Sequence, residues 1–315
     1  MDLIIKIKGF SKERRATAIA TITATLLAIV KLAIGVMSGS VAVLASAIDS
    51  ILDSAISVFN FFAIKKAEEQ PNELFPYGKG KVQAIAGVIE GTIITISGIY
   101  IIYEAIKKIA NEDSTEMLGA SIGVMVISVL VTYFLVKYLE RIAKETDNIV
   151  IKSDAIHYKA DLISNGAVLI SIFLVFVTGL DFIDAIFGLA IGIYIIYSAY
   201  EIISEGVLIL LDRSLDAEIV AKIGEIIANE KDARGYHWLK TRTDGVHNFV
   251  EFHLVLDPQM TIERAHNIAD DIICKITALE PNKGWVINPH FDPHDDEEKN
   301  VRIFEGNTSC ATDEK

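Results

Sequence analysis

Long runs of apolar residues dominate the first two thirds of this chain. Six runs each reach the roughly 20 residues that a helix needs to cross the hydrocarbon core of a bilayer. They cover residues 17–37, 41–64, 82–103, 118–138, 155–178 and 183–211. The links at 38–40 and 179–181 are as short as hairpins, whereas the other links are longer and charged. The pattern therefore predicts a membrane domain of six transmembrane helices over residues 1–211.

Basic side chains gather on one side of these predicted spans. Lysine and arginine residues precede the first span, lie in the second-to-third and fourth-to-fifth links, and follow the sixth span. On the other side only Lys107 and Lys108 stand out. Because basic residues mark cytoplasmic loops, we expect a multi-pass protein of the inner (cytoplasmic) membrane with both termini in the cytoplasm.

From residue 212 the pattern becomes that of an ordinary charged domain. Helical periods run over 216–229 and 261–279, and strand-like runs cover 237–242, 246–256 and 285–291. This α-β-β-α-β order predicts a small split α/β sandwich over residues 212–293. Residues 294–315, with four consecutive acids at 295–298, are expected to form a disordered acidic tail.

Composition agrees with this division. The chain of 315 residues is 51% hydrophobic and has a net charge of -13, with a mean hydropathy of +0.40. From residue 212 onward there are 21 acidic and 12 basic side chains. An acidic domain disfavours nucleic acid and suits cations. Cys274 and Cys310 form no motif with metal-ligand spacing, and a reducing compartment is the simpler interpretation.

Two short motifs place ionisable residues inside the predicted spans: Asp49-x-x-x-Asp53 and His157-x-x-x-Asp161. Each spacing puts two side chains one turn apart on one helix face. Such residues cost about 2.5–3.5 kcal/mol each at the centre of a span, and are rare without a function. Three carboxylates and one imidazole can supply the four ligands of tetrahedral Zn²⁺, and would also accept Fe²⁺, Mn²⁺, Co²⁺ or Cd²⁺. Two hydrogen-bonded polar clusters with a structural role are the alternative, which the cost of two such motifs disfavours.

Other polar residues also fall inside the spans. They are Lys31, Asn60, Glu90, Lys159, Asn165 and Asp184. For Lys31, Glu90 and Lys159 the pattern leaves three interpretations open: a structural ion pair, an interfacial side chain that reaches toward water, or transport chemistry.

A second candidate metal site lies in the last third of the chain. Its members are His237, His253, His266, His290 and Asp292. Strand alternation places His290 and Asp292 on one face. Scattered surface histidines are common, so these residues alone leave open whether the five converge. His247 and His294 are expected to be ordinary exposed residues.

These motifs together resemble the cation diffusion facilitator family, in its bacterial zinc and ferrous-iron efflux branch. The resemblance covers nearly the whole chain. It rests on Ser38-Gly39-Ser40, on Pro76-Tyr77-Gly78-x-x-Lys81, on the two intramembrane motifs, on the six spans and on the C-terminal domain.

The resemblance implies more than the residues do. It implies that the four intramembrane residues are the transport site and that metal export is coupled to proton entry. It also implies a homodimer with ferredoxin-like cytoplasmic domains, whose metal site at the dimer interface matches the five residues given above. Lys81 and Asp212 resemble a family ion pair that holds the dimer together, with Arg213 beside it.

One departure from the family pattern lies in the loop between the second and third spans. Some close relatives carry an additional metal site there, built from an aspartate and two histidines. The matching positions here are Asn72, Phe75 and Lys79. Phenylalanine cannot ligate a metal, and a protonated lysine repels a cation. We therefore expect this loop site to be absent.

These features predict a divalent-metal exporter that works by proton antiport and alternating access. Its partners would be metal ions, protons, the lipid bilayer and a second copy of the chain, and no nucleic acid. Zn²⁺ is the expected ion, transported and bound, although the ligands do not choose between Zn²⁺ and Fe²⁺. An enzyme is not expected, because catalytic metal sites keep an open water position and a nearby general base. A membrane sensor that binds metal without transporting it stays open as the alternative.

Overall fold

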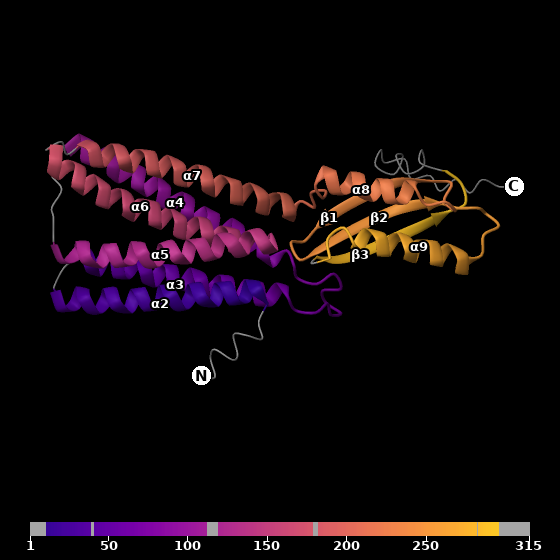
Figure 1. Cartoon of the computed structure of the whole chain (residues 1–315), viewed down its shortest axis with the longest axis horizontal. Coiled ribbons are helices and arrows are strands. Elements are labelled where there is room, and N and C mark those ends of the chain that lie inside the picture. The colour runs from indigo at the N-terminus through magenta and orange to yellow at the C-terminus, as the bar shows by residue number, and fades with distance from the viewer. Residues whose placement is uncertain (1–10, 39–40, 112–118, 179–181, 282, 296–315) are drawn as a thin grey trace. The chain divides into compact units, whose positions relative to one another are not determined.

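The computed structural model describes residues 11–38, 41–111, 119–178, 182–281 and 283–295. Some side chains within these ranges, including those of Asp49 and Asp184, are outside the described part. The chain forms two compact units, Met1–Leu210 and Leu211–Lys315 (Figure 1). Of the expected acidic tail, residues 296–315 lie outside the described residues.

The first unit is built from long helices, one on each predicted apolar run. They are α2 (Lys12–Ser38), α3 (Val41–Ala67), α4 (Val82–Asn111), α5 (Gly119–Thr146), α6 (Ile149–Thr178) and α7 (Phe182–Leu210). The predicted helical membrane fold is confirmed. Three stretches within the described residues are long and apolar enough to cross a membrane: Lys12–Ile34, Val82–Lys107 and Gly188–Leu210. The full count of six spans stays a prediction.

Glycines allow two of these helices to pack closely. Helix α4 runs along α7, α2 runs along α3, and α6 contacts both α5 and α7 (Figure 1). A Cβ atom added at Gly98 of α4 would lie 3.2 Å from the carbonyl oxygen of Gly192, and one at Gly192 would lie 3.0 Å from that of Gly98. A larger residue at either position would push the backbones apart, as at other small-residue helix contacts in membranes.

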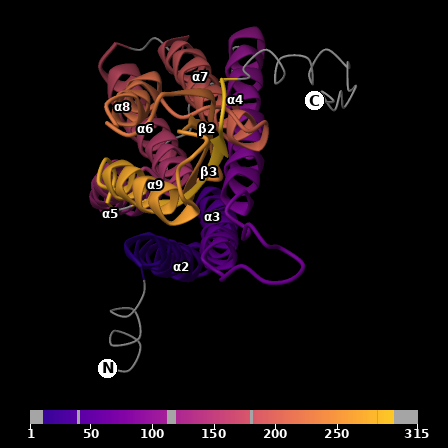
Figure 2. The same cartoon turned by 90° about the vertical axis from the view of Figure 1, so that its right-hand side faces the viewer.

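The second unit follows the predicted α-β-β-α-β order. Its elements are α8 (Ala217–Ala228), β1 (Gly235–Thr243), β2 (His247–Val255), α9 (Ile262–Thr277) and β3 (Gly284–Asp292). Strand β2 is central, antiparallel to β1 and parallel to β3. Helices α8 and α9 contact each other and lie on one side of the sheet (Figure 2). The predicted small α/β domain is confirmed.

The two faces of β2 differ in character. Val250, Phe252 and Leu254 are fully buried and belong to one core with Ile272 of α9. Because successive side chains of a strand point to opposite faces, His253 lies on the face away from that core. The apolar pattern of β2 thus fixes which sheet face presents the histidines.

The turn between β1 and β2 contains an ion pair. The carboxylate of Asp244 accepts hydrogen bonds from the N–H groups of Val246 and His247 (2.8 and 2.7 Å) and lies 3.4 Å from Nδ1 of His247. Although burial opposes its charge, hydrogen bonds from His247 lower the pKa of Asp244. The bond to Asp244 in turn raises the pKa of His247. His247 is therefore a structural residue, and the expectation of an ordinary exposed histidine is wrong.

This ion pair predicts a pH-dependent stability effect of His247→Gln. Because its pKa is raised on folding, charged His247 stabilises the unit fully below its ordinary pKa of about 6.5, and the effect is lost as pH rises through the raised value. The variant should therefore lower the melting temperature more at pH 6 than at pH 9. Fluorescence of Trp238 and Trp285 reports unfolding of this unit. An equal loss at both pH values would contradict the account, and His294→Gln is the control.

Candidate metal centres

Helices α3 and α6 bring three of the four predicted intramembrane ligands together. Asp53, His157 and Asp161 each offer one ligand atom, and these atoms lie within 4.8 Å of one another. Nε2 of His157 is 3.1 Å from Oδ1 of Asp53 and 3.8 Å from Oδ2 of Asp161. Asp49 lies one turn before Asp53 on α3, but its side chain is outside the described residues.

This geometry makes the intramembrane group a place where protons and metal ions compete. His157 is buried, with 8% of its surface exposed, and its Nε2 atom faces both carboxylates. A protonated Nε2 would donate to these carboxylates, whereas a metal ion needs the same nitrogen deprotonated. The group can therefore hold either a proton or a divalent cation between the same three side chains.

The second unit brings together four of the five residues predicted for its metal site. Strand register places His253 opposite both His237 of β1 and His290 of β3. The ring centroids of neighbouring histidines in this row are 5.0 and 4.6 Å apart. Asp292 lies two residues beyond His290, where Leu256 N–H donates to its carbonyl oxygen (2.9 Å).

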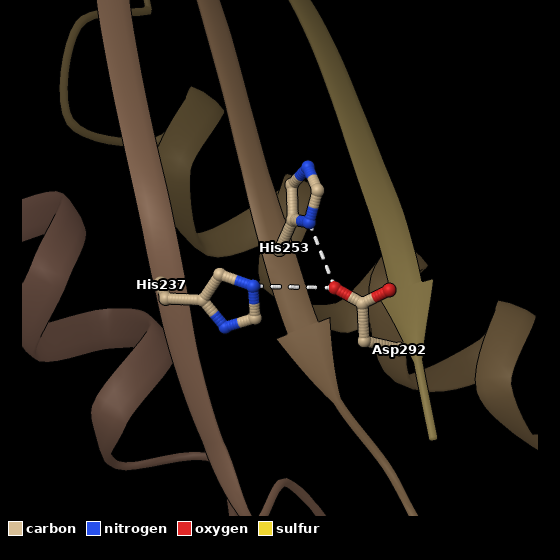
Figure 3. A group of neighbouring side chains, drawn as sticks. All are labelled: His237, His253 and Asp292. Carbon is tan, nitrogen blue, oxygen red and sulfur yellow. Dashed lines mark hydrogen bonds and ion pairs between the residues drawn. The ribbon is translucent and has the colours of Figure 1, made fainter. Parts of the chain in front are cut away.

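The carboxylate of Asp292 is the centre of this group. Its Oδ2 atom is 2.7 Å from Nδ1 of His253 and 3.3 Å from Nε2 of His237 (Figure 3). Its Oδ1 atom is 3.2 Å from Nε2 of His290. The ligand atoms of His237, His253 and Asp292 lie within 4.8 Å of one another. Two imidazoles and a carboxylate are common ligands of Zn²⁺.

A bulge in β1 sets the position of His237. The register of β1 on β2 shifts between His237 and Lys240, and Trp238 adopts a φ of 57°. This left-handed conformation is strained for a bulky residue. Bulges re-aim side chains next to functional sites. The Lys240 ammonium group lies 3.8 Å from the centroid of the Trp238 ring, which is within the range of a favourable cation–π contact.

His266 does not join this group within one chain. It lies on α9, its side chain is 69% exposed, and its Nε2 atom is 3.5 Å from Oδ2 of Asp270. Helix α9 covers the apolar face of the sheet, whereas the other histidines lie on the opposite face. A role for His266 as a fifth ligand stays a prediction about the dimer.

Two of the other polar residues predicted inside the spans, Lys31 and Lys159, have defined neighbours. Lys31 donates to Ser50 (2.8 Å), and Lys159 pairs with Glu140 (3.1 Å). The ion pair of Lys81 with Asp212, which the resemblance implies holds the dimer together, stays a prediction. Within the first unit, the Lys81 ammonium group donates to the carbonyl oxygen of Leu210 (3.2 Å). Within the second unit, the carboxylate of Asp212 lies 3.4 Å from the guanidinium group of Arg242. Arg213 follows Asp212 in the chain.

In the loop between α3 and α4, the side chain of Lys79 lies where the expected metal site of some relatives would be. The Lys79 ammonium group lies 2.7 Å from Glu69 and 4.9 Å from the centroid of the Phe75 ring. The side chain of Asn72 accepts hydrogen bonds from the N–H groups of Leu74 and Phe75. The three positions at which relatives are expected to hold metal thus form a turn, an aromatic contact and an ion pair.

Loss of the Lys79 ammonium group should loosen the loop. Hydrogen bonds from Lys79 and then Lys66 lower the pKa of Glu69 to about 2. The contribution of the Glu69 carboxylate to the stability of the loop is complete above its ordinary pKa. It is lost only as pH falls through about 2. Lys79→Gln should therefore speed amide hydrogen exchange at Phe75 and Gly78, equally at pH 6 and pH 8. Lys66→Gln, which removes the more exposed partner, should have a smaller effect. Unchanged exchange in Lys79→Gln would contradict this role.

The fold and the two groups define a class of protein: a multi-pass membrane protein with metal-type ligands inside its helical bundle and in a small α/β domain. The Cation efflux transmembrane domain family matches residues 17–211, and the family described as Cation efflux protein, cytoplasmic domain (ZT_dimer), matches residues 215–294. The chain therefore belongs to the cation efflux, or cation diffusion facilitator, family, and the predicted resemblance is confirmed.

Two FieF relatives agree with this assignment. The cation-efflux pump FieF of Pectobacterium atrosepticum is 30% identical over 283 residues, which cover 89% of this chain and 93% of that protein. FieF of Cronobacter sakazakii is 31% identical over 279 residues, covering 89% and 92%. A solved structure of the zinc form of CzrB is 29% identical, covers 27% of this chain and 96% of its own, and has a TM-score of 0.25. The family match and these relatives confirm the predicted function at the level of cation efflux.

Proposed function

We propose that this protein exports divalent transition-metal ions, Zn²⁺ or Fe²⁺ foremost, from the cytoplasm by proton antiport. The observation that carries the proposal is the group of Asp53, buried His157 and Asp161, in which one imidazole nitrogen faces two carboxylates. Asp49, one turn along α3, would complete the four ligands of a tetrahedral ion.

The transport cycle follows from competition at His157. With the group open to the cytoplasm, a metal ion displaces the proton from Nε2 and binds to the carboxylates. The helices then expose the group to the other side of the membrane, where arriving protons return to His157 and release the ion. An inward proton gradient favours release on the outer side and so drives export.

The second unit is proposed to bind metal as a cytoplasmic dimerisation domain in a homodimer. The match to the ZT_dimer family supports dimerisation, and the group around Asp292 supports metal binding. Both termini would then be cytoplasmic, in a protein of the inner membrane. Metal in this acidic domain would reduce repulsion between the two copies and could regulate transport.

Collapse of the proton gradient tests the antiport mechanism. Proteoliposomes that hold the full-length protein and a Zn²⁺ indicator should accumulate Zn²⁺ when the lumen is acidic relative to the bath. An ionophore that collapses the gradient should remove this uphill accumulation and leave downhill flux. Uphill accumulation that survives the ionophore would contradict antiport. Tight metal binding without flux under either condition would favour the membrane sensor.

The same flux measurement can rank the transported metal ions. The relatives are named cation-efflux pumps, which supports transport rather than a chemical reaction. Competition of Fe²⁺, Cd²⁺ and Mn²⁺ with Zn²⁺ flux would rank the ions, since one imidazole and carboxylates leave the choice to geometry and availability.

A further inference from the structure

A row of buried polar contacts continues from the intramembrane group toward the end of the unit where α4 and α6 begin. Next to the Asp53–His157 contact, the hydroxyl groups of Ser57 and Tyr158 are 2.7 Å apart. Both side chains are buried. Ser57 lies one turn after Asp53 on α3, so these two contacts are neighbours along the helices.

The row then reaches two carboxyl groups that share one amide. The Nδ2 atom of Asn60 donates to Oε2 of Glu90 and to Oδ1 of Asp154, at 2.8 Å in both cases. At most 1% of any of these three side chains is exposed. Beyond them, Asn148, just before α6, donates to Gln83 of α4 (2.9 Å). We call Gln83, Asn148, Asn60, Glu90, Asp154, Ser57 and Tyr158 the polar row.

Glu90 and Asp154 do not form a structural ion pair. Among the described residues, no lysine or arginine lies within ion-pair distance of either carboxyl group. The remaining oxygen atoms, Oε1 of Glu90 and Oδ2 of Asp154, are buried and accept no hydrogen bond from the described residues. Two adjacent carboxylates without a cation repel each other strongly in such a place. The pair must therefore hold at least one proton.

No lysine or arginine among the described residues is placed to neutralise the Glu90–Asp154 pair, so the pair can still bind a proton. His157 and Tyr158 of α6 are two titratable groups that act on it electrostatically, and Asp53 of α3 lies beyond Ser57. Lys152 lies two residues from Asp154 but is engaged by Glu201 (3.6 Å) and Glu205 of α7.

We propose that the Glu90–Asp154 pair is a second proton site, which takes up a proton when metal binds to the intramembrane group. This inference rests on the proposed function. At rest the pair holds one proton and one negative charge. When a metal ion displaces the proton of His157, the remaining carboxylate gains one proton and the pair becomes neutral. Ser57 and Tyr158 lie between the two sites, and each hydroxyl can both accept and donate a proton.

The position of the pair gives it a role in the direction of transport. Asp154 precedes His157 by three residues on α6, and Asn60 follows Asp53 by seven on α3. Both steps lead to the end of the unit that is proposed to face the cytoplasm. A proton that moves from the metal site to the pair therefore moves toward the cytoplasm. Antiport requires the proton to leave on that side.

Infrared difference spectroscopy of the full-length protein, with and without Zn²⁺, tests this site. Metal binding should produce the C=O stretching band of a newly protonated carboxylic acid. Glu90→Gln should lack this band and should release more protons to the buffer per Zn²⁺ bound. Glu140→Gln is the control. It removes a carboxyl group that pairs with Lys159 outside the polar row, and it should keep the native band. Asp154→Asn serves as the second variant if Glu90→Gln fails to fold.

Each outcome is decisive. Loss of the band in Glu90→Gln or Asp154→Asn, with Zn²⁺ still bound, supports the second proton site. A native protein without the band, or a band that survives in both variants, overturns it. Proton-coupled Zn²⁺ flux in the native protein without the band would overturn this inference alone. Native protein that binds no Zn²⁺ would overturn the proposed function and this inference with it.

Discussion

His157→Ala should lower metal export by more than about 100-fold, since loss of a metal ligand is expected to exceed the 10–100-fold effect of losing a ligand's hydrogen-bond partner. His157 supplies the only nitrogen of the proposed transport site, and its Nε2 atom faces both described carboxylates. The variant loses a ligand and the group that exchanges a proton for metal, so both binding and coupling should fail. Zn²⁺ flux into proteoliposomes measures the effect.

Two further variants separate the chemistry of His157 from its packing. His157→Asp restores a ligand but makes the site entirely oxygen, so it should bind Mn²⁺ better relative to Zn²⁺. Lys159→Gln changes a charged residue on the same helix that pairs with Glu140, and should retain most of the flux. Native Zn²⁺ flux in His157→Ala would contradict the assignment of the transport site.

Asp292→Ala should have the largest effect on metal binding by the second unit, weakening it by roughly 100-fold, with about 10-fold for His290→Ala. The carboxylate of Asp292 contacts His237, His253 and His290, whereas the side chain of His290 is 66% exposed. Removal of Asp292 therefore takes away the anion that orients three imidazoles.

Calorimetry on the full-length protein carrying Asp53→Ala isolates this second site. Trp238, whose ring centroid is 6.1 Å from that of His253, provides a fluorescence signal for the same event. His266→Ala tests the dimer, because one chain alone leaves His266 outside the group. Equal Zn²⁺ affinities in Asp292→Ala and its parent would contradict the site. If the site also regulates transport, Asp292→Ala should alter activation of flux by metal while the intramembrane group stays intact.

The sequence predicts the elements of this fold well because each has a clear hydrophobic period. Apolar runs mark the long helices, and alternation marks β2, in which Val250, Phe252 and Leu254 are buried. Spacing also predicts that His157 and Asp161 share a face. It cannot predict that Asp53, on another helix, lies 3.1 Å from His157, because that depends on how α3 and α6 pack.

The sequence is less informative where function depends on register. The three histidines come together because His237 pairs with His253 and His253 pairs with His290. The arrangement also requires a bulge at Trp238, which no residue type in the sequence predicts. His266 has the same chemistry but lies on the helix that covers the other face. The sequence predicts that Asn60 and Glu90 are polar residues inside spans, yet Asn60 joins Glu90 to Asp154 only when α3, α4 and α6 meet.

The most direct test of the central claim is a paired measurement of Zn²⁺ binding and Zn²⁺ flux for the native protein and Asp53→Ala under an imposed pH gradient. The account predicts gradient-dependent flux in the native protein, and loss of both flux and intramembrane binding in Asp53→Ala, with binding by the second unit retained. Flux in Asp53→Ala equal to that of the native protein would contradict the claim that the group of Asp53, His157 and Asp161 carries the metal across the membrane.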